Sequence, residues 1–318
     1  MSILIPQINI VIPLYNESFV FQNLINRITH LLNTSNISIE VILVDDGSTD
    51  DTALLIAKLS KIDKRFQAVI LSRNFGHQIA LTAGLSYVNA SEAVFILDGD
   101  LQDPPELLTE FYAKYKEGYD VVYAVRKKRK EGFFKTLAYK LFYKILKSIS
   151  YIDIPLDSGD FSLVSKKVID QLNSMPEESR FIRGMRSWVG FNQIGIEYNR
   201  SEREQGESKY TFSKLLKLAL NGIFNFSEFP IKAISNLGMI TIFISMVYLI
   251  YTLYMKIMYN NIPEGFTSLV FLIILFGGIN LLAIGIIGEY ILRIFFQVKA
   301  RPLFIVKQHI KDQMLQNG

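Results

Sequence analysis

The stretch VFILDGDLQDPPE, Val94 to Glu106, places three carboxylates directly after an apolar run. The apolar residues end at Leu97, and Asp98, Asp100 and Asp103 follow before two prolines stop the chain from continuing as a strand. A continuous apolar run bounded in this way is typical of a strand that is buried on both faces of a sheet. The stretch therefore predicts a buried strand whose carboxyl end carries acidic side chains.

Four more apolar runs in the first 125 residues alternate with segments of helical length: INIVIP, IEVILVDD, FQAVILS and DVVYAV. This alternation predicts an α/β domain with a doubly wound, mostly parallel sheet covered on both faces. Ligands of such sheets bind beyond the carboxyl ends of the strands. We therefore expect the polar residues after the runs to meet at one edge, namely Tyr15, Asn16, Glu17, Asp45, Asp46, Arg73, Asn74, Asp98 and Asp100.

Two long segments near the C-terminus carry no charge. They run for 23 residues from Ala233 to Met255 and for 24 residues from Gly265 to Gly288. Each would be roughly 35 Å long as a helix, enough to cross a hydrocarbon core of about 30 Å. Buried core helices are the alternative, but they rarely run past about 20 residues without a charge. We predict a hairpin of two transmembrane helices at about 232–255 and 266–291.

The basic residues around these segments predict the orientation of the hairpin. The loop from Lys256 to Glu264 holds one lysine, whereas five basic residues follow the second segment. Because cytoplasmic flanks of spans are enriched in lysine and arginine, we expect a multi-pass protein of the cell (inner) membrane with its α/β domain and both termini in the cytoplasm. The N-terminus has no basic leader and does not resemble a signal peptide.

Two amphipathic segments separate the sheet from the first span. Arg126 to Lys147 holds nine basic residues and one acid, with apolar residues at helical spacing, which suits an anionic membrane surface or an ordinary surface helix. Tyr210 to Phe226 leads directly into the first span, and this position favours the membrane interface. We expect a cytoplasmic α/β domain at 1–209, an interfacial helix at 210–230, two membrane helices at 231–292 and a cytoplasmic tail at 293–318.

The composition restricts the chemistry of any site. The chain has no cysteine and only three histidines, so disulfides and thiolate metal sites are excluded and a metal would be held by oxygen. The net charge of +4, without a nucleic-acid-binding motif, gives no reason to expect nucleic acid as a partner. Neither GxGxxG nor GxxxxGK[ST] follows a strand, which argues against a dinucleotide cofactor or a P-loop.

The DGD sequence itself indicates a metal-bound diphosphate. Two neighbouring carboxylates, Asp98 and Asp100, repel each other unless a cation lies between them. Oxygen ligands favour Mg²⁺ or Mn²⁺, and such ions usually complete their coordination with substrate phosphates. Asp-Gly is also a common turn sequence, so DGD taken alone leaves an ordinary turn open.

Several motifs together resemble a known family. VIPLYNE, VDDGSTDDT, SRNFGHQIALTAGL and DGDLQDPPE, in this order, resemble the family 2 glycosyltransferases with the nucleotide-binding GT-A fold. With DSGDFSL, EREQGESKYTF and the two apolar segments, the chain resembles the polyprenyl-phosphate glycosyltransferases, the group of dolichyl-phosphate mannose synthase and bactoprenol glucosyltransferase.

This resemblance implies roles for individual residues. Nucleotide-sugar binding would fall to Pro13, Tyr15, Glu17, Asp46, Asn74, Gly76, Gln78, Asp98 and Gln102, and the metal, Mg²⁺ or Mn²⁺, to Asp98, Asp100 and Gln102. Catalytic roles would fall to Asp157, Asp160 and Asp100, with Asp157 and Asp160 in a loop that the family places against the sugar. Asp157 would be a base or would orient the sugar, because a phosphate acceptor with a second pKa of about 6 is already largely ionised; a turn-capping role is the alternative.

The lipid phosphate would be bound by Arg203, Lys209 and Arg200, since guanidinium groups grip phosphate oxygens at two points. A solvated charged loop is the alternative for this segment. The implied reaction is an inverting transfer of a sugar from a UDP-sugar to polyprenyl (undecaprenyl) phosphate at the cytoplasmic face of the bilayer. Glucose is the first expectation for the sugar. We also expect the protein to be a homo-oligomer.

The sequence leaves the sugar and the type of activity open. N-acetylglucosamine, mannose or a modified arabinose could replace glucose, because a few pocket contacts decide the choice of sugar. A processive polysaccharide synthase is an alternative, although QxxRW is absent and two spans do not easily enclose a polymer channel. A non-catalytic membrane scaffold is another, although it would be expected to lose acidic positions that this chain keeps.

Overall fold

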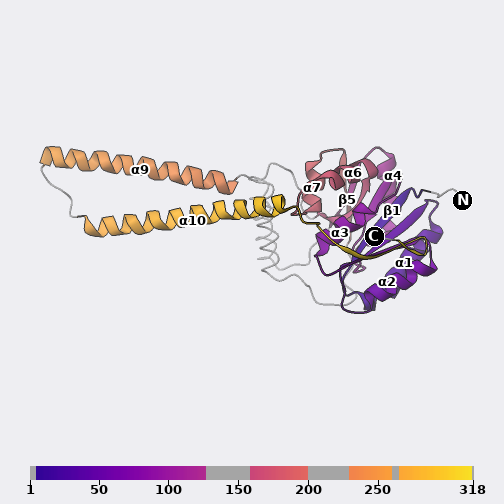
Figure 1. Cartoon of the computed structure of the whole chain (residues 1–318). Helices are drawn as coiled ribbons and strands as arrows, with labels where there is room; N and C mark the ends of the chain where they lie inside the picture. The colour runs from indigo at the N-terminus through magenta and orange to yellow at the C-terminus, as the bar shows by residue number, and fades with distance from the viewer. Residues whose placement is uncertain (1–4, 127–157, 200–228, 260–264, 317–318) are drawn as a thin grey trace. The chain divides into compact units, whose positions relative to one another are not determined.

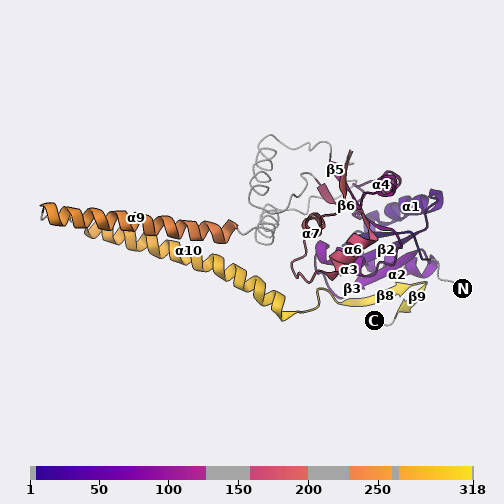
Figure 2. The same cartoon turned by 90° about the horizontal axis from the view of Figure 1, so that it is seen from above.

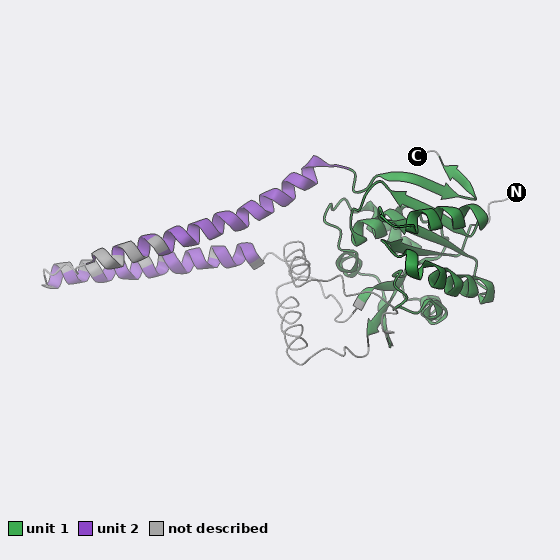
Figure 3. Ribbon diagram, turned by 90° about the horizontal axis from the view of Figure 1, so that it is seen from below, with its two compact units in different colours: residues 1–147, 152–215, 302–318 green, residues 148–151, 216–301 purple. Residues whose placement is uncertain are grey.

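The structure is a computed structural model that describes residues 5–126, 158–199, 229–259 and 265–316. The chain forms two compact units. Unit 1 comprises residues 1–147, 152–215 and 302–318, and unit 2 comprises residues 148–151 and 216–301 (Figure 3).

Unit 1 is built on a single mixed sheet with the strand order β7-β5-β6-β4-β1-β2-β3-β8-β9. Neighbouring strands among β4, β1, β2 and β3 pair in parallel, and β6 and β8 run antiparallel to their neighbours. The predicted doubly wound, mostly parallel α/β sheet is confirmed. The strands are β1 Ile8–Leu14, β2 Ile39–Asp45, β3 Phe66–Leu71, β4 Ala93–Ile96, β5 Val121–Arg126, β6 Ser158–Ser165, β7 Gln193–Tyr198, β8 Val306–Lys311 and β9 Met314–Gln316.

Helices cover both faces of this sheet (Figures 1 and 2). On one face α3 packs against β1, β2 and β3, and α6 and α7 continue this layer over β6. On the other face α4 packs against β5 and β6, and α2 against β2 and β3. The helices of unit 1 are α1 Ser18–Thr34, α2 Thr52–Ile62, α3 His77–Ser86, α4 Leu108–Lys116, α6 Lys166–Ser174 and α7 Ile182–Trp188, with the 3₁₀ turn η1 Pro105–Leu107 before α4.

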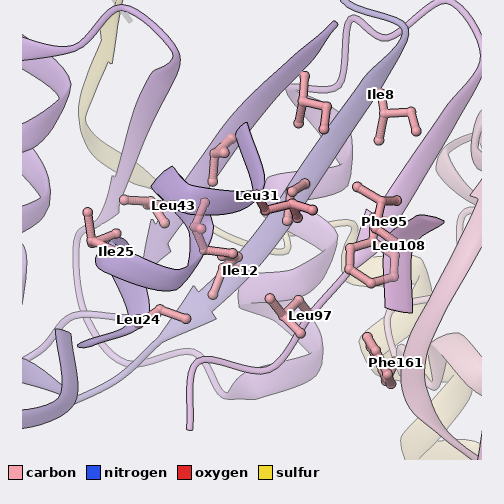
Figure 4. Close-up of a cluster of buried hydrophobic side chains, with 14 of the residues drawn as sticks. Ile8, Ile12, Leu24, Ile25, Leu31, Leu43, Phe95, Leu97, Leu108 and Phe161 are labelled. Carbon is pink, nitrogen blue, oxygen red and sulfur yellow. The ribbon is translucent and has the colours of Figure 1, made fainter. Parts of the chain in front are cut away.

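The central strands are apolar because they have no solvent-facing side. All seven residues of β1 are buried, and the same is true of all six residues of β3. Figure 4 shows part of the resulting core, in which Ile12 of β1, Leu24 of α1 and Phe95 of β4 belong to one cluster of buried side chains. Burial of this kind, at roughly 25 cal/mol per Å² of apolar surface, stabilises the sheet that positions the edge residues.

The last two strands were not predicted from the sequence. Residues 306–311 form β8, which pairs antiparallel with β3, and β9 pairs with β8. Side chains reinforce this long-range pairing: the ring Nε2 of His309 lies 2.6 Å from Nε2 of Gln67, and Lys311 lies 3.8 Å from the carboxylate of Glu40. The chain that leaves the sheet for unit 2 therefore returns to it.

Unit 2 contains two long helices, α9 Phe229–Tyr259 and α10 Phe266–Lys299, which run side by side (Figures 1 and 2). Both are long and apolar enough to cross a membrane. They also expose large apolar side chains such as Phe243 at 71% and Leu281 at 73%, far more apolar surface than a soluble protein normally leaves in water. The two helices are therefore candidate membrane spans, as predicted.

The sequence also predicts an ion pair between Glu289 and Arg293 at the end of the second span, and this ion pair is confirmed. The Arg293 guanidinium lies 3.0 Å from Glu289 Oε1, one helical turn away on α10. The predicted amphipathic helices fall within residues 127–157 and 200–228, outside the described part of the chain. Arg126, which the sequence analysis counted in the first of them, is instead the last residue of strand β5 because its backbone continues the pairing with β7.

Candidate active site

The first two loops at the carboxyl edge of the sheet are locked together. Asn16, which follows β1, has a positive φ of 53°, and its side-chain oxygen accepts the backbone N–H of Thr49 at 2.8 Å. The Asn16 N–H donates in return to the hydroxyl of Ser48 at 3.0 Å. Glu17 N–H donates to the hydroxyl of Thr52 at 3.0 Å. These bonds hold the β1–α1 and β2–α2 loops in fixed positions relative to each other.

Asp46 fixes the next loop along this edge. Its two carboxylate oxygens accept the backbone N–H groups of Phe75 and Gly76 at 2.7 and 3.0 Å. Burial raises the pKa of Asp46, although these two bonds oppose the rise. Gly47 allows the loops to touch, since a Cβ on it would lie 2.2 Å from the backbone carbon of Arg73.

The DGD segment leaves β4 at the same edge, in close contact with β1. A Cβ on Gly99 would lie 2.2 Å from Cδ2 of Leu14, so only glycine fits between the two acids. Asp98 Oδ1 is buried and has no hydrogen-bond partner among the described residues, while 27% of the side chain is exposed. Burial raises the pKa of Asp98 to about 6; the cation of His77 opposes this, and the charges of other aspartates add to it.

Asp160 faces this segment from strand β6. The sequence analysis placed Asp160 in a loop, which is wrong, because residues 158–165 pair antiparallel with β4 and β5. Ile96 lies opposite Ser162 in this antiparallel pairing. Asp98 comes two residues after Ile96 and Asp160 two residues before Ser162, so the two aspartates meet at the same point of the edge. Gln78 on α3 donates to Oδ2 of Asp160 at 2.7 Å.

Cations surround the Asp160 carboxylate. Nε2 of His77 lies 3.5 Å from Oδ2, and Nε of Arg183 on α7 lies 3.6 Å from Oδ1. Burial alone would raise the pKa of Asp160, but Arg183, His77 and Arg186 outweigh it and hold the pKa well below its usual range. The cations around it therefore favour the ionised form of Asp160.

His77 takes part in both acidic motifs. Its Nε2 lies 3.7 Å from Oδ1 of Asp98 in addition to the contact with Asp160. Partial burial opposes protonation of the ring, but the hydrogen bond to Asp160 and the charges of both carboxylates raise the pKa of His77 to about 9. At neutral pH the imidazole therefore carries a positive charge at the centre of this edge.

A family comparison covers most of the elements that build this edge. The model of the family described as glycosyl transferase family 2 matches residues 9–172, which span β1 to α6. The chain belongs to glycosyltransferase family 2.

Relatives of this glycosyltransferase match it over nearly its full length. An "Uncharacterized glycosyltransferase YkcC" of Bacillus subtilis (strain 168) is 44% identical over 303 residues, covering 95% of this chain and 94% of the relative. A "Bactoprenol glucosyl transferase" of Shigella phage SfII is 35% identical, covering 95% and 98%. A "Prophage bactoprenol glucosyl transferase homolog" of Escherichia coli (strain K12) is 34% identical, covering 95% and 99%.

The structure brings several sequence-predicted residues of the glycosyltransferase to one edge. Tyr15 and Glu17 follow β1, Asp46 follows β2, and Asn74, Gly76 and Gln78 follow β3, while Pro13 lies within β1 itself. Asp98, Asp100 and Gln102 follow β4, where the backbone N–H of Gln102 donates to Asp100 Oδ1 at 3.2 Å. Asp157, Arg200, Arg203 and Lys209 lie outside the described residues.

The acidic residues at this edge fit a metal ion whose coordination is completed by the substrate. Among the described residues, no group of three or more histidine or acidic side chains could hold an ion by itself. Mg²⁺, however, is usually bound by one or two carboxylates together with substrate phosphates. Asp98 and Asp100 offer two carboxylates, and such an incomplete site would leave a buried carboxylate oxygen like Oδ1 of Asp98, which accepts no hydrogen bond from the described residues.

Four charged or polar residues of the glycosyltransferase edge were not singled out from the sequence. His77, Arg183 and Arg186 lie around Asp160, and Arg186 is 1% exposed with its Nη2 donating to the Gly159 carbonyl at 3.5 Å. Tyr198 of β7 donates a short hydrogen bond to the buried Asp103. His77, in the short segment between the third strand run and the next helix, was a visible signal, whereas the arginines of FIRGMRSW come near the site only through α7.

Proposed function

We propose that this glycosyltransferase transfers a hexose, glucose in the first instance, from a UDP-sugar to polyprenyl phosphate at the cytoplasmic face of a membrane. The observation that carries the proposal is the likeness, over 95% of the chain, to a relative named for bactoprenol glucosyl transfer. The two apolar helices, α9 and α10, support a lipid-linked acceptor, because an acceptor with a polyprenyl tail lies in the bilayer.

Chain connectivity supports the proposed topology. Strand β8 pairs with β3, so the segment after α10 lies on the same side of a membrane as the sheet. The chain returns to the same side only if it crosses the membrane an even number of times. The two helices of unit 2 would supply two crossings. The excess of basic residues after α10 favours the cytoplasm for that side.

In the proposed reaction an oxygen of the lipid phosphate attacks the anomeric carbon while the bond from that carbon to the UDP oxygen breaks, with inversion. The acceptor is already largely ionised, so no residue needs to remove a proton from it. Asp98 and Asp100 would hold Mg²⁺ or Mn²⁺, which when bound would neutralise charge on the departing diphosphate. Asp160 keeps its neighbours oriented, and Asp157 remains the candidate for orienting the sugar.

We assign the binding of the acceptor phosphate to Arg203, Lys209 and Arg200. In the sequence they lie between the catalytic domain and the first span. Planar guanidinium groups at headgroup depth would bind the phosphate of the lipid. The acceptor phosphate and the donor diphosphate would then be held by different parts of the chain. This separation allows the two halves of the site to be tested independently.

The test is to incubate membranes that contain the protein with polyprenyl phosphate and one labelled nucleotide sugar at a time, and then to extract the lipid. We expect label from UDP-glucose in a phosphosugar lipid that is sensitive to mild acid. Membranes with the Asp100→Ala protein serve as the control. Label in a polymer instead of the lipid would support a processive synthase, and no transfer from any nucleotide sugar would refute the proposal.

A further inference from the structure

Asp103 is the third carboxylate of the DGDLQDPPE segment, and it differs from the other two in its burial. Asp103 is 1% exposed, whereas Asp98 and Asp100 are both partly exposed at the edge of the sheet. It comes directly after Gln102, the last residue of the predicted metal site. An acid buried in this way is shielded from the donor, but it can fix the segment that carries the other two acids.

The backbone between the two exposed acids and Asp103 is strained. Leu101 has a φ of 60°, in the left-handed region that residues with a large side chain rarely adopt, and it is 4% exposed. The following N–H group, of Gln102, donates to Oδ1 of Asp100 at 3.2 Å. A backbone conformation of this kind persists only where the surrounding structure holds it in place. The loop Asp98–Asp103 therefore depends on the contacts at its ends.

Tyr198 of β7 makes such a contact at the Asp103 end. Its hydroxyl donates a short hydrogen bond to Oδ1 of Asp103, which lies 95 residues away in the sequence. Tyr198 is 6% exposed, so both partners are buried. Hydrogen bonds to a carboxylate are stronger than neutral ones, and a buried bond is stronger than one in water. The bond therefore ties the loop firmly to the last residue of β7.

The ring of Tyr198 is itself held in a fixed place. It packs edge-on against Phe161 of β6, with ring centroids 5.6 Å apart. Phe161 in turn contacts the rings of Phe95 and Phe111, at 5.2 and 5.3 Å. In the sheet Tyr198 pairs with Arg126 of β5, whose guanidinium also interacts with the tyrosine side chain. The hydroxyl that reaches Asp103 is thus presented by the rigid core of the sheet.

We propose that Tyr198 is a positioning residue for the donor: by holding Asp103, it keeps the loop Asp98–Asp103 in the conformation in which Asp98 and Asp100 bind the metal of the nucleotide sugar. This inference rests on the proposed function, because that function assigns the metal to these two acids. Tyr198 acts through Asp103 and touches neither metal nor sugar. Substitution of residues that support metal ligands commonly changes metal affinity 10-fold to 100-fold, by order of magnitude about what we expect here.

The experiment uses the full-length protein and begins with Tyr198→Phe, which removes the hydroxyl and keeps the ring that packs against Phe161. Tyr112→Phe is the matched control, because it removes a tyrosine hydroxyl that donates to Glu92 at 2.9 Å, outside the site. The paramagnetic signal of Mn²⁺ measures its binding in the presence of UDP. The measurement is made at a temperature where thermal unfolding curves show every variant to be folded.

We expect Tyr198→Phe to weaken Mn²⁺ binding about 10-fold and to raise by a similar factor the Mn²⁺ concentration that gives half-maximal transfer. Tyr112→Phe should match the wild type in both measurements. A hydroxyl that only stabilises the fold would leave the Mn²⁺ affinity of the folded protein unchanged. Wild-type Mn²⁺ affinity in folded Tyr198→Phe would therefore overturn the inference, and so would equal losses of affinity in the two tyrosine variants.

Asp103→Asn tests whether the effect passes through Asp103. The amide keeps the size of the side chain but accepts a weaker hydrogen bond than the carboxylate does. Tyr198→Phe should therefore cost less Mn²⁺ affinity in the Asp103→Asn background than in the wild type, and fully additive losses would overturn the inference. If Tyr198→Phe does not fold, Asp103→Asn decides the question, and wild-type Mn²⁺ affinity in that variant would also refute the role of the pair.

Failure of the proposed function gives a different result. A wild type that binds Mn²⁺ with UDP but labels no lipid would refute the lipid acceptor and leave the comparison of the tyrosine variants intact. A wild type that binds no Mn²⁺ in the presence of UDP would overturn the inference, because the loop would then hold no metal.

Discussion

Gln78 donates its side-chain amide hydrogen to Oδ2 of Asp160 at 2.7 Å, and through its amide oxygen it also accepts the backbone N–H of Ile182 at 2.8 Å. A single side chain thereby joins α3, the start of β6 and the start of α7. The sequence analysis assigned Gln78 to the nucleotide side of the site. Its hydrogen bonds show that it also connects that side to the strand that carries Asp160.

We therefore predict that Gln78→Ala costs about 1–3 kcal/mol in the free energy of unfolding, because a buried carboxylate and a backbone N–H each lose a partner. Thermal and denaturant unfolding of the purified protein measure this loss. Gln78→Glu should be worse, since it sets a second carboxylate against Asp160. Gln22→Ala, which removes an exposed bond to Asn26 on α1, is the control and should change stability little.

A second prediction concerns the close contact at Gly47. Its φ is +66°, and a Cβ would lie 2.2 Å from the backbone carbon of Arg73. Gly47→Ala should therefore displace the β3–α3 loop, lower stability by more than about 1 kcal/mol and raise the KM for the donor. Gly118→Ala is the matched control. Gly118 also has a positive φ, +101°, but a Cβ added to it would have no atom within 4 Å. Equal effects of the two substitutions would mean that backbone strain alone matters at Gly47.

A third prediction is a pH dependence of stability. Asp50 accepts the backbone N–H groups of Ser18 and Thr52. Burial opposes ionisation, but hydrogen bonds from the side chains and the backbone of Thr52 and Ser18 lower the pKa of Asp50 to about 2. Because the folded pKa lies below the unfolded value of about 3.9, the stabilisation is present above pH 4 and is lost as the pH falls towards 2. Asp50→Asn should be less stable than wild type at pH 7, and this difference should shrink between pH 4 and 2.

A fourth prediction tests the metal. Asp100→Ala, or excess chelator with the wild type, should abolish transfer, because the diphosphate would lose its counter-charge. Asp98→Ala should behave similarly but retain some nucleotide binding. Binding of Mn²⁺ followed by its paramagnetic signal provides a readout that does not depend on transfer. Full activity of the purified enzyme in excess chelator would show that the metal assignment is incorrect.

The local pattern of the sequence predicted the central part of the fold. The five apolar runs correspond to strands β1 to β5, because strands buried on both faces must be continuously apolar. Strands β6 and β8 were not predicted as strands. Their sequences, SGDFSLVS and VKQHIK, contain many polar residues, and each strand is defined by its pairing with a distant part of the chain.

The residues of the site also divide into those that local sequence pattern predicts and those that long-range packing brings in. Acidic residues such as Asp98 and Asp46 follow strand runs directly, so their place at the edge could be predicted from the topology rule. Arg183 and Arg186 reach Asp160 through the packing of α7 against β6, which no short-range pattern specifies. His77 was visible in the sequence, but its contacts depend on the antiparallel register that brings Asp98 and Asp160 together.

The last prediction concerns the lipid phosphate. If Arg203 binds it, Arg203→Ala should cripple transfer to the polyprenyl acceptor and leave UDP-sugar affinity nearly intact, because in the proposed site the donor would be held by residues at the edge of the sheet. Lysine at position 203 should rescue poorly, since an ammonium keeps the charge but cannot reproduce the planar two-point contact. Titration of the Arg203→Ala protein with UDP-sugar, followed by rates at rising acceptor concentration, separates the two effects. Unchanged acceptor kinetics would place the phosphate elsewhere, and a large loss of UDP-sugar affinity would move Arg203 to the donor diphosphate.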